Sequence, residues 1–310
     1  MLKYLVIQLD DTSVSFCHYT NENKKSRLIG LDYLKEGILF AMKENLMVQF
    51  IYPEFSLPEE YQKLIETIDH CKIVPYNNQE EAEVVVIDDW KILENFEVKE
   101  SIAYIIRTNK KDFFNYHSQL YKIFENGSRL NIVITDVETF DEQDFKNYRI
   151  ALKTLAIQIK NLYADGLSPQ LNLLTDRLAL ENMNNCNAGW ENIALAPNGM
   201  FYVCPAFYLE NEKSSIGDLI NGLDVKNPQL YRIDHAPLCR NCDAYQCKRC
   251  IWLNKKTTLE VNTPSHEQCV VAHLERNSSR ALLEDVRTLG TFLPDKEIKE
   301  IDYLDPFEKI

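Results

Sequence analysis

Four cysteines crowd into the segment CRNCDAYQCKRC, residues 239–250. Three more lie on either side of it, at Cys186, Cys204 and Cys269, so seven of the nine cysteines of the chain fall between residues 186 and 269. Disulfides, structural zinc and iron–sulfur clusters all explain such clustering. No other residue type is comparably concentrated, so these thiols are the first candidates for function.

Disulfides fit the sequence poorly. The N-terminal residues MLKYLVIQLDD alternate in the manner of a strand and reach acidic residues at once. They contain no basic n-region, apolar h-region or small-residue cleavage site, so we expect no secretion signal and a cytoplasmic protein. Closely spaced cysteine pairs outside an oxidising compartment more often hold metal.

Zinc and iron–sulfur clusters both remain open, as do inert thiols. The two Cys-x2-Cys pairs of the segment offer the four thiolates that a structural zinc ion binds. Zinc ribbons usually separate such pairs by about 15–20 residues, whereas only residues 243–246 separate them here. A ferredoxin-like run is as dense, and its last cysteine reaches a different cluster. That pattern predicts two clusters, one on Cys239, Cys242, Cys247 and Cys269 and a second on Cys186, Cys204 and Cys250.

A hairpin is predicted next to Cys204. The run IALAPNGMFYV, residues 193–203, contains two alternating segments joined by a Pro-Asn-Gly turn. Asn198 followed by Gly199 is a strong hairpin signal, because both residue types tolerate positive φ. Since the second strand returns antiparallel to the first, we expect Cys204 to lie close to Cys186.

The cysteine pattern resembles that of SPASM domains, which bind auxiliary [4Fe-4S] clusters in radical S-adenosylmethionine (radical SAM) enzymes that modify peptides. Cys186-x12-Gly199-x4-Cys204 matches the first half of the family pattern, although the spacers of the 239–250 segment are shorter than usual. The resemblance implies the same two ligand groups as above. It also implies that one iron site of the second cluster is open or filled by an outside ligand.

Over essentially its full length the chain resembles the CXXX repeat peptide maturases, proteins encoded beside small peptides with repeated Cys-x3 units. The stretches LDDTSVSFCHY (9–19) and LDYLKEGILFAMKENL (31–46) carry this resemblance together with the cysteine-rich end. It implies a part in maturing a ribosomally made, Cys-rich precursor peptide (a RiPP).

Residues 1–180 alternate apolar strands with helices. EVVVI (83–87) and SIAYII (101–106) look buried on both faces, and helices are predicted at 31–46, 58–69, 111–126 and 141–163. This order predicts a parallel sheet with helical cover, either doubly wound or a partial barrel. The resemblance favours a partial (β/α)6 TIM-like barrel, radical SAM-like, over residues 1–180. A SPASM-like Fe–S domain over 181–275 and a C-terminal helix and acidic tail over 276–310 would follow.

The motif for the catalytic cluster of radical SAM enzymes is incomplete here. In that family Cys-x3-Cys-x2-Cys follows the first strand; this chain has Cys17 there, but Asn21 and Lys24 at the other two positions. Neither side chain replaces a thiolate on iron. We therefore expect no cleavage of S-adenosylmethionine and no site for it, and we assign no catalytic residue.

Other polar residues have plainer interpretations. Cys17 and Cys71 are interpreted as structural thiols, and the pair Asp10 and Asp11 as a solvated turn. His266 and His273 flank Cys269, and a solvated or capping role is the simpler interpretation of both. Ser278–Leu289 is predicted to be helical.

Composition narrows the function classes. The 310 residues carry a net charge of −13, which disfavours nucleic-acid binding, and no apolar run approaches the roughly 18 residues of a membrane span. We expect a protein that binds the Cys-rich precursor peptide and presents it, or passes electrons, to a complete radical SAM maturase. The alternatives are an active maturase that uses the auxiliary clusters and a zinc-stapled binding module with no redox role.

Overall fold

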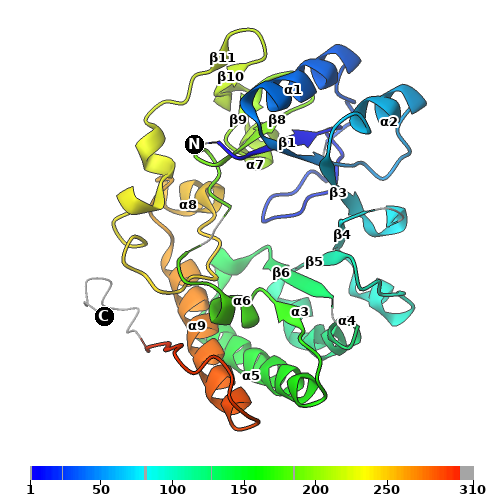
Figure 1. The fold of residues 1–310 in the computed structure, drawn as a ribbon. Helices are drawn as coiled ribbons and strands as arrows, with labels where there is room; N and C mark the ends of the chain where they lie inside the picture. Colours follow the sequence, from blue (N-terminus) through cyan, green and yellow to red (C-terminus); the bar gives the residue numbers. More distant parts are fainter. Residues whose placement is uncertain (1, 23, 80–81, 127, 184–185, 301–310) are drawn as a thin grey trace. The chain divides into compact units, whose positions relative to one another are not determined.

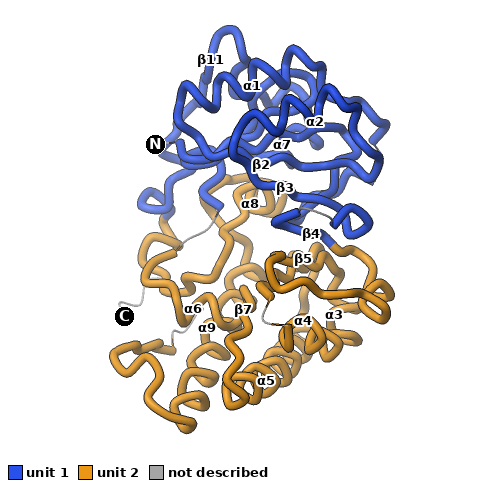
Figure 2. The backbone as a smooth tube through the Cα atoms, turned by 45° about the vertical axis from the view of Figure 1, so that its right-hand side comes forward, with its two compact units in different colours: residues 1–86, 186–236 blue, residues 87–185, 237–310 orange. Residues whose placement is uncertain are grey.

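The computed structural model describes residues 2–22, 24–79, 82–126, 128–183 and 186–300 (Figure 1). Residues 301–310 of the predicted acidic tail lie outside the described residues. The chain forms two compact units, residues 1–86 with 186–236 (unit 1) and residues 87–185 with 237–310 (unit 2) (Figure 2). Each unit draws on two separate stretches of sequence, and the predicted boundaries at 180 and 275 remain a prediction.

Unit 1 is built on a sheet with the strand order β4-β3-β2-β1-β8-β9. Its strands are β1 (Tyr4–Gln8), β2 (Met47–Ile51), β3 (His70–Pro75), β4 (Val84–Ile87), β8 (Asn192–Leu195) and β9 (Phe201–Tyr202). β1 pairs in parallel with β2 and β8, and Ile7 lies opposite both Phe50 and Leu195. All three side chains are fully buried, as expected for parallel strands that are covered on both faces.

The helices of unit 1 are α1 (Leu31–Glu44), α2 (Glu59–Ile65) and α7 (Pro205–Glu210). A two-stranded hairpin and short 3-10 turns complete the unit: β10 (Gly217–Asp218), β11 (Gly222–Leu223), η1 (Tyr76–Asn78), η5 (Glu212–Ser214), η6 (Pro228–Tyr231) and η7 (Ile233–His235). α1 approaches β8 through Gly37, where a Cβ atom would lie 2.4 Å from Leu195 Cδ2. The absence of a side chain at Gly37 therefore allows close helix–sheet packing.

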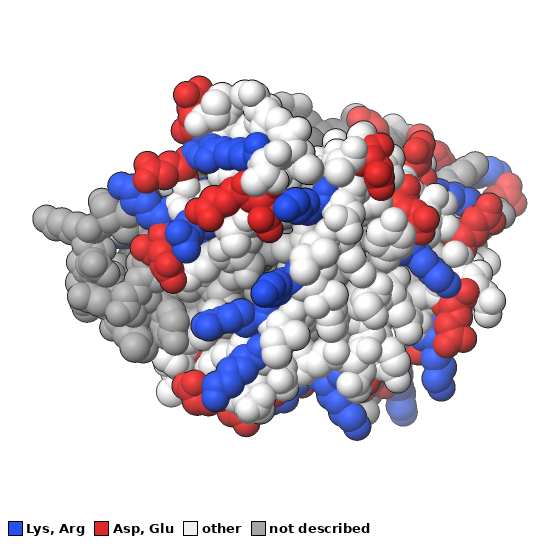
Figure 3. All heavy atoms as spheres, turned by 90° about the horizontal axis from the view of Figure 1, so that it is seen from below, with Lys and Arg blue, Asp and Glu red and all other residues white. Residues whose placement is uncertain are grey.

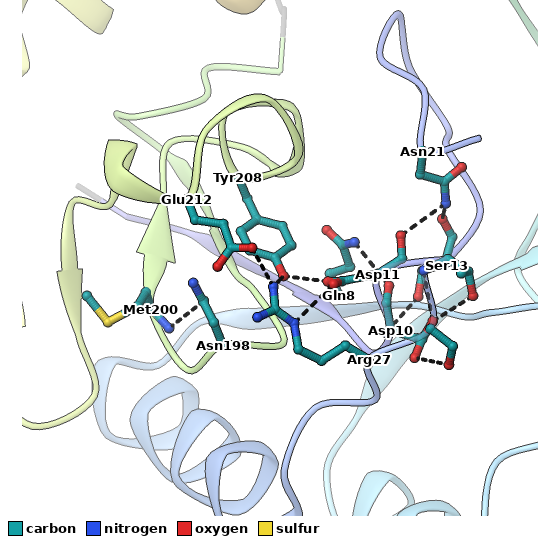
Figure 4. Close-up of polar contacts among 12 residues, drawn as sticks. Gln8, Asp10, Asp11, Ser13, Asn21, Arg27, Asn198, Met200, Tyr208 and Glu212 are labelled. Carbon is teal, nitrogen blue, oxygen red and sulfur yellow. Dashed lines mark hydrogen bonds and ion pairs between the residues drawn. The ribbon is translucent and has the colours of Figure 1, made fainter. Parts of the chain in front are cut away.

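The predicted hairpin is present, with a different turn. β8 and β9 are antiparallel, and Leu195 lies opposite Phe201. Gly199 has a φ of +76°, whereas Asn198 does not adopt the positive φ that it would tolerate. The connection is therefore a longer loop closed by a left-handed glycine. Asn198 instead accepts a hydrogen bond from Met200 N at 3.1 Å, as Figure 4 shows.

Unit 2 contains the parallel strands β5 (Ala103–Thr108), β6 (Arg129–Ile134) and β7 (Gln170–Leu171). Its helices are α3 (Lys110–Tyr116), α4 (Tyr121–Phe124), α5 (Glu142–Ala164), α6 (Thr175–Ala179), α8 (Ile251–Thr258) and α9 (His266–Arg287), with 3-10 turns η2 (Trp90–Glu94), η3 (His117–Leu120) and η4 (Val137–Thr139). The helix predicted at 111–126 is broken by η3. α9 begins twelve residues before the predicted helix at Ser278, because Ser265 caps it by accepting a hydrogen bond from Gln268 N.

α5 and α9 lie side by side in unit 2 (Figure 1). Leu152 and Leu155 of α5 and Leu282 and Leu283 of α9 are buried. On the other side of α5, Ile150 is 64% exposed. Figure 3 views the molecule from the side on which α5 lies in Figure 1. On this face several Lys and Arg side chains lie next to residues that carry no charge.

The chain is thus an α/β protein with an extensive parallel sheet, as predicted. Closure into a partial barrel and a separate cysteine-rich domain remain predictions. None of the helices in the described part of the chain is long and apolar enough to cross a membrane.

Candidate functional site

The four cysteines predicted to bind the first cluster all belong to unit 2. The loop that carries three of them is tightly turned, with Cys242 N donating to Cys239 O at 3.1 Å and Cys247 N donating to Ala244 O at 2.9 Å. Cys269 lies in the first turn of α9. Cys247 and Cys269 are each close enough to Cys239 and Cys242 to interact electrostatically. The structure therefore brings these four thiols together; their binding of metal remains a prediction.

Burial governs the protonation of these thiols. It raises the pKa of Cys239 to about 11 and that of Cys269 to about 12, and it raises the pKa of Cys247 well above its ordinary value. In the absence of metal the thiols are therefore protonated at neutral pH. Metal binding requires thiolates and so releases their protons.

Hydrogen-bond donors already point at two of the sulfurs. The backbone N–H of Ala244 donates to Cys242 Sγ, and that of Arg249 donates to Cys247 Sγ, both at 3.4 Å. Such donors stabilise the thiolate over the thiol. By residue type, four cysteines with N–H donors on two sulfurs are the donor set of an iron–sulfur cluster, whose properties depend on hydrogen bonds to sulfur. In the ranges that the structure describes, no group of three or more His, Cys, Asp or Glu side chains is arranged to hold a metal ion.

The interpretation of His273 as a solvated or capping residue is wrong. Its Nε2 lies 3.4 Å from Cys242 Sγ. Burial lowers the pKa of His273 to about 4, with a further contribution from the charge of Arg276. His273 is therefore neutral at physiological pH. His266 and His273 both lie on α9, and only the tertiary structure shows that His273 meets a thiol.

Two buried arginines adjoin the same thiols. Arg276 Nη1 pairs with Asp243 Oδ1 at 2.8 Å, and Arg177 Nη2 pairs with Asp243 Oδ2 at 3.2 Å. The guanidinium of Arg177 also lies over the ring of Tyr245, 4.3 Å from its centroid. Both arginines act electrostatically on Cys242. Sequence reasoning missed them, because Arg177 and Arg276 lie far from the cysteine segment along the chain.

The residues predicted for the second cluster fall in both units. Cys186 and Cys204 belong to unit 1, and Cys250, which immediately precedes α8, belongs to unit 2. Cys204 is close enough to Cys186 to interact electrostatically, as the hairpin predicted, and Cys17 also acts on it. Burial raises the pKa of Cys204. The grouping of Cys186 and Cys204 with Cys250 remains a prediction.

Radical SAM enzymes hold their catalytic cluster on the segment after β1. In this chain, hydrogen bonds from polar side chains hold that segment together (Figure 4). Asn21 Nδ2 donates to the carbonyl oxygens of Ser13 and Asp11, at 2.5 and 3.4 Å. Ser13 Oγ in turn donates to Ile51 O at the end of β2, at 2.8 Å. The amide of Asn21 thus crosslinks the loop, while Lys24 is partly exposed.

The interpretation of Asp10 and Asp11 as a solvated turn is wrong, since both are buried. Asp11 accepts hydrogen bonds from the hydroxyl of Tyr208 and from Arg27 Nε, the latter at 3.0 Å. Arg27 Nη2 also pairs with Glu212 at 2.8 Å (Figure 4). Burial raises the pKa of Tyr208, and the neighbouring Asp11 carboxylate raises it further. This network ties α7 and η5 to the segment after β1.

Comparisons with known proteins define the fold. No protein-family model and no curated protein matches the chain. Among solved structures, native anSMEcpe with bound AdoMet and Cp18Cys peptide has a TM-score of 0.63 at 12% identity, covering 93% of this chain and 100% of that chain. The complex with Kp18Cys peptide has a TM-score of 0.61 at 13% identity, covering 92% and 99%. Native anSMEcpe with bound AdoMet alone matches with a TM-score of 0.61, at 12% identity and with coverage of 93% and 100%.

The chain accordingly has a radical SAM-like fold. All three of these anSMEcpe structures contain bound AdoMet, and two of them also contain a peptide. At this level of identity the likeness concerns the fold alone. The expectation of a radical SAM-like fold is confirmed, and membership of the CXXX repeat peptide maturases remains a prediction.

Proposed function

We propose that this protein takes part in maturing a ribosomally made, Cys-rich peptide, and that it carries iron–sulfur clusters without cleaving S-adenosylmethionine. The supporting observation is a group of four close thiols with N–H donors on two sulfurs, in a chain with the fold of a radical SAM maturase. Structures of anSMEcpe contain a bound peptide, which supports a peptide partner for this chain. The resemblance to CXXX repeat peptide maturases suggests the substrate class.

Each part of the proposal rests on named residues. Cys239, Cys242, Cys247 and Cys269 hold one [4Fe-4S] cluster, and Cys186, Cys204 and Cys250 hold a second. When bound, such clusters supply one-electron transfer or an iron site for a thiolate. The protein itself binds the precursor peptide and presents it, or passes electrons, to a complete radical SAM maturase.

The loop after β1 supports the absence of S-adenosylmethionine cleavage. Asn21 and Lys24 provide no thiolate, and the amide of Asn21 is engaged by two backbone carbonyls. A cluster at this point would therefore lack two ligands and would displace the bonds that hold the loop.

Metal analysis of protein purified without oxygen tests the cofactor. We expect about eight irons and eight sulfides per chain with broad visible absorbance, as two cubane clusters require. The variant Cys71→Ser, which alters a thiol outside both groups, serves as the control and should leave these values unchanged. A colourless protein with one or two zinc ions would contradict the proposal. It would favour the alternative of a zinc-stapled binding module.

A second assay tests the missing activity. The reduced protein is incubated with S-adenosylmethionine, with and without a CXXX-repeat peptide, and 5′-deoxyadenosine is quantified. We expect none above the background of heat-treated protein. Turnover would contradict the interpretation of Asn21 and Lys24 and would favour an active maturase.

A further inference from the structure

Two buried positive charges lie beside the four-cysteine group and share one carboxylate. Arg276 is fully buried and Arg177 is 3% exposed. Both guanidinium groups bind the same side chain, that of Asp243. Since arginine stays protonated in proteins, two positive charges bind the one carboxylate of Asp243.

Neutral groups make further contacts with both arginines. Arg276 Nη1 also donates to Lys299 O at 3.0 Å, and Arg177 stacks on the ring of Tyr245. Nε and Nη1 of Arg177 are buried and meet no hydrogen-bond acceptor among the residues that the structure describes. The carboxylate that Arg177 shares therefore compensates its positive charge only in part. Burying an incompletely compensated charge costs free energy unless a further anion lies close.

The glutamate next to Arg276 on α9 is engaged elsewhere. Glu275 accepts hydrogen bonds from Tyr148 at 2.6 Å and from Gln246 at 3.2 Å. His273 is neutral, as described above. Asp243, which both arginines bind, directly follows Cys242 in the chain, so both guanidinium groups lie near that thiol and act on it electrostatically. Arg249 acts electrostatically on Cys239.

We infer that Arg177 and Arg276 are positioning residues that compensate the charge of the four-cysteine group and set the reduction potential of the cluster bound there. This inference rests on the proposed function, because it requires thiolate-bound iron. Deprotonated and metal-bound, the four cysteines form an anionic group beside the partly compensated guanidinium of Arg177. A one-electron reduction adds negative charge, so nearby positive charge favours the reduced state and raises the potential.

Substitutions of opposite sign test the inference in the intact, anaerobically purified protein. Arg177→Gln removes a positive charge and should lower the midpoint potential of one cluster by about 60 mV, which corresponds to a tenfold change in its one-electron equilibrium. Asp243→Asn removes the shared negative charge and should raise the same potential. Arg177→Lys keeps the charge and should stay near the wild-type value. The readout is a redox titration followed by electron paramagnetic resonance, with iron content measured on the same samples.

A matched control distinguishes the effect of the removed charge from a general loss of structure. Arg280 lies one turn further along α9 and pairs with Glu284 and Glu300 instead of Asp243, so Arg280→Gln should leave the potential unchanged. If either Arg177 variant fails to fold, Asp243→Asn still predicts a shift of defined sign. If the wild-type protein, purified without oxygen, contains no iron, both the proposed function and this inference are wrong. Normal iron content with potentials that do not respond to Arg177→Gln or Asp243→Asn would overturn the inference alone.

Discussion

The hydroxyl of Tyr208 donates a hydrogen bond to the buried carboxylate of Asp11, which lies 197 residues earlier in the chain. The bond joins α7, which follows Cys204, to the segment after β1, which carries Cys17. Arg27 contacts both partners and so completes the junction. Two stretches that the sequence analysis treated as separate domains thus meet within unit 1 (Figure 4).

Removing the Tyr208 hydroxyl should destabilise unit 1. Tyr208→Phe leaves the buried Asp11 with one donor fewer, and we expect a loss of about 1–3 kcal/mol in the free energy of unfolding. Urea denaturation measures it. Tyr33→Phe alters an exposed tyrosine of the same unit and should change stability by less than about 0.5 kcal/mol. Equal effects of the two variants would contradict the structural role of the bond.

The loop crosslink made by Asn21 predicts a second difference. Asn21→Ala should lower the free energy of unfolding by about 1–2 kcal/mol, since the Ser13 and Asp11 carbonyls lose their donor. Lys24→Ala, at the other substituted motif position, should be within about 0.5 kcal/mol of wild type. If Asn21→Ala is also neutral in urea denaturation, the amide does not hold the loop.

Gly199 is expected to resist substitution for two reasons. Its φ is +76°, and an added Cβ would lie 2.9 Å from the ring of Tyr33. Gly166 has a φ of +84° with no atom within 4 Å of the added Cβ, so Gly166→Ala measures the backbone strain alone. That strain costs about 1–2 kcal/mol. Thermal or urea unfolding should show a larger loss for Gly199→Ala, and an equal loss would mean that the Tyr33 ring moves aside freely.

Glu275 predicts a pH-dependent stability. Burial raises the pKa of Glu275 to about 7, although Tyr148 and Gln246 oppose the shift with hydrogen bonds to its carboxylate. Between about pH 4.5 and 7 the folded state therefore binds more protons than the unfolded state, so stability falls as the pH rises through that window. The raised pKa corresponds to about 3 kcal/mol.

Comparing urea denaturation of metal-free protein at pH 5 and pH 8 measures this effect. Glu275→Gln should flatten the difference, because the neutral amide replaces a titrating carboxyl. An unchanged profile in the variant would assign the pH dependence to other groups.

The ligand assignment predicts unequal effects of cysteine substitutions. Cys239→Ser and Cys269→Ser each remove a thiolate from the same group, so each should reduce the iron content by up to about half. Cys71→Ser, in β3, should retain full iron. Iron and sulfide assays on protein purified without oxygen decide the matter, and full iron in both ligand variants would refute the first cluster assignment.

Much of the fold was predictable because its signals are local. The apolar runs at 83–87 and 101–106 correspond closely to β4 and β5, and the Asn-Gly turn marked the hairpin of β8 and β9. The start of α9 was missed, because the cap at Ser265 precedes a polar first turn with little apolar periodicity. The break between α3 and α4 was missed for a similar reason, since no proline or glycine interrupts residues 111–126.

The sequence by itself determined the α/β class, the cysteine spacing and the absence of two motif cysteines after the first strand, since each is a matter of residue type at fixed separation. The tertiary structure decided which residues surround those cysteines. His273 on α9 contacts Cys242, Arg177 on α6 binds the adjacent Asp243, and Tyr208 on α7 binds Asp11. Such pairs depend on how strands and helices pack, and burial then sets their charge state. Neither the packing of strands and helices nor the charge state of a buried group produces a periodic pattern in the sequence.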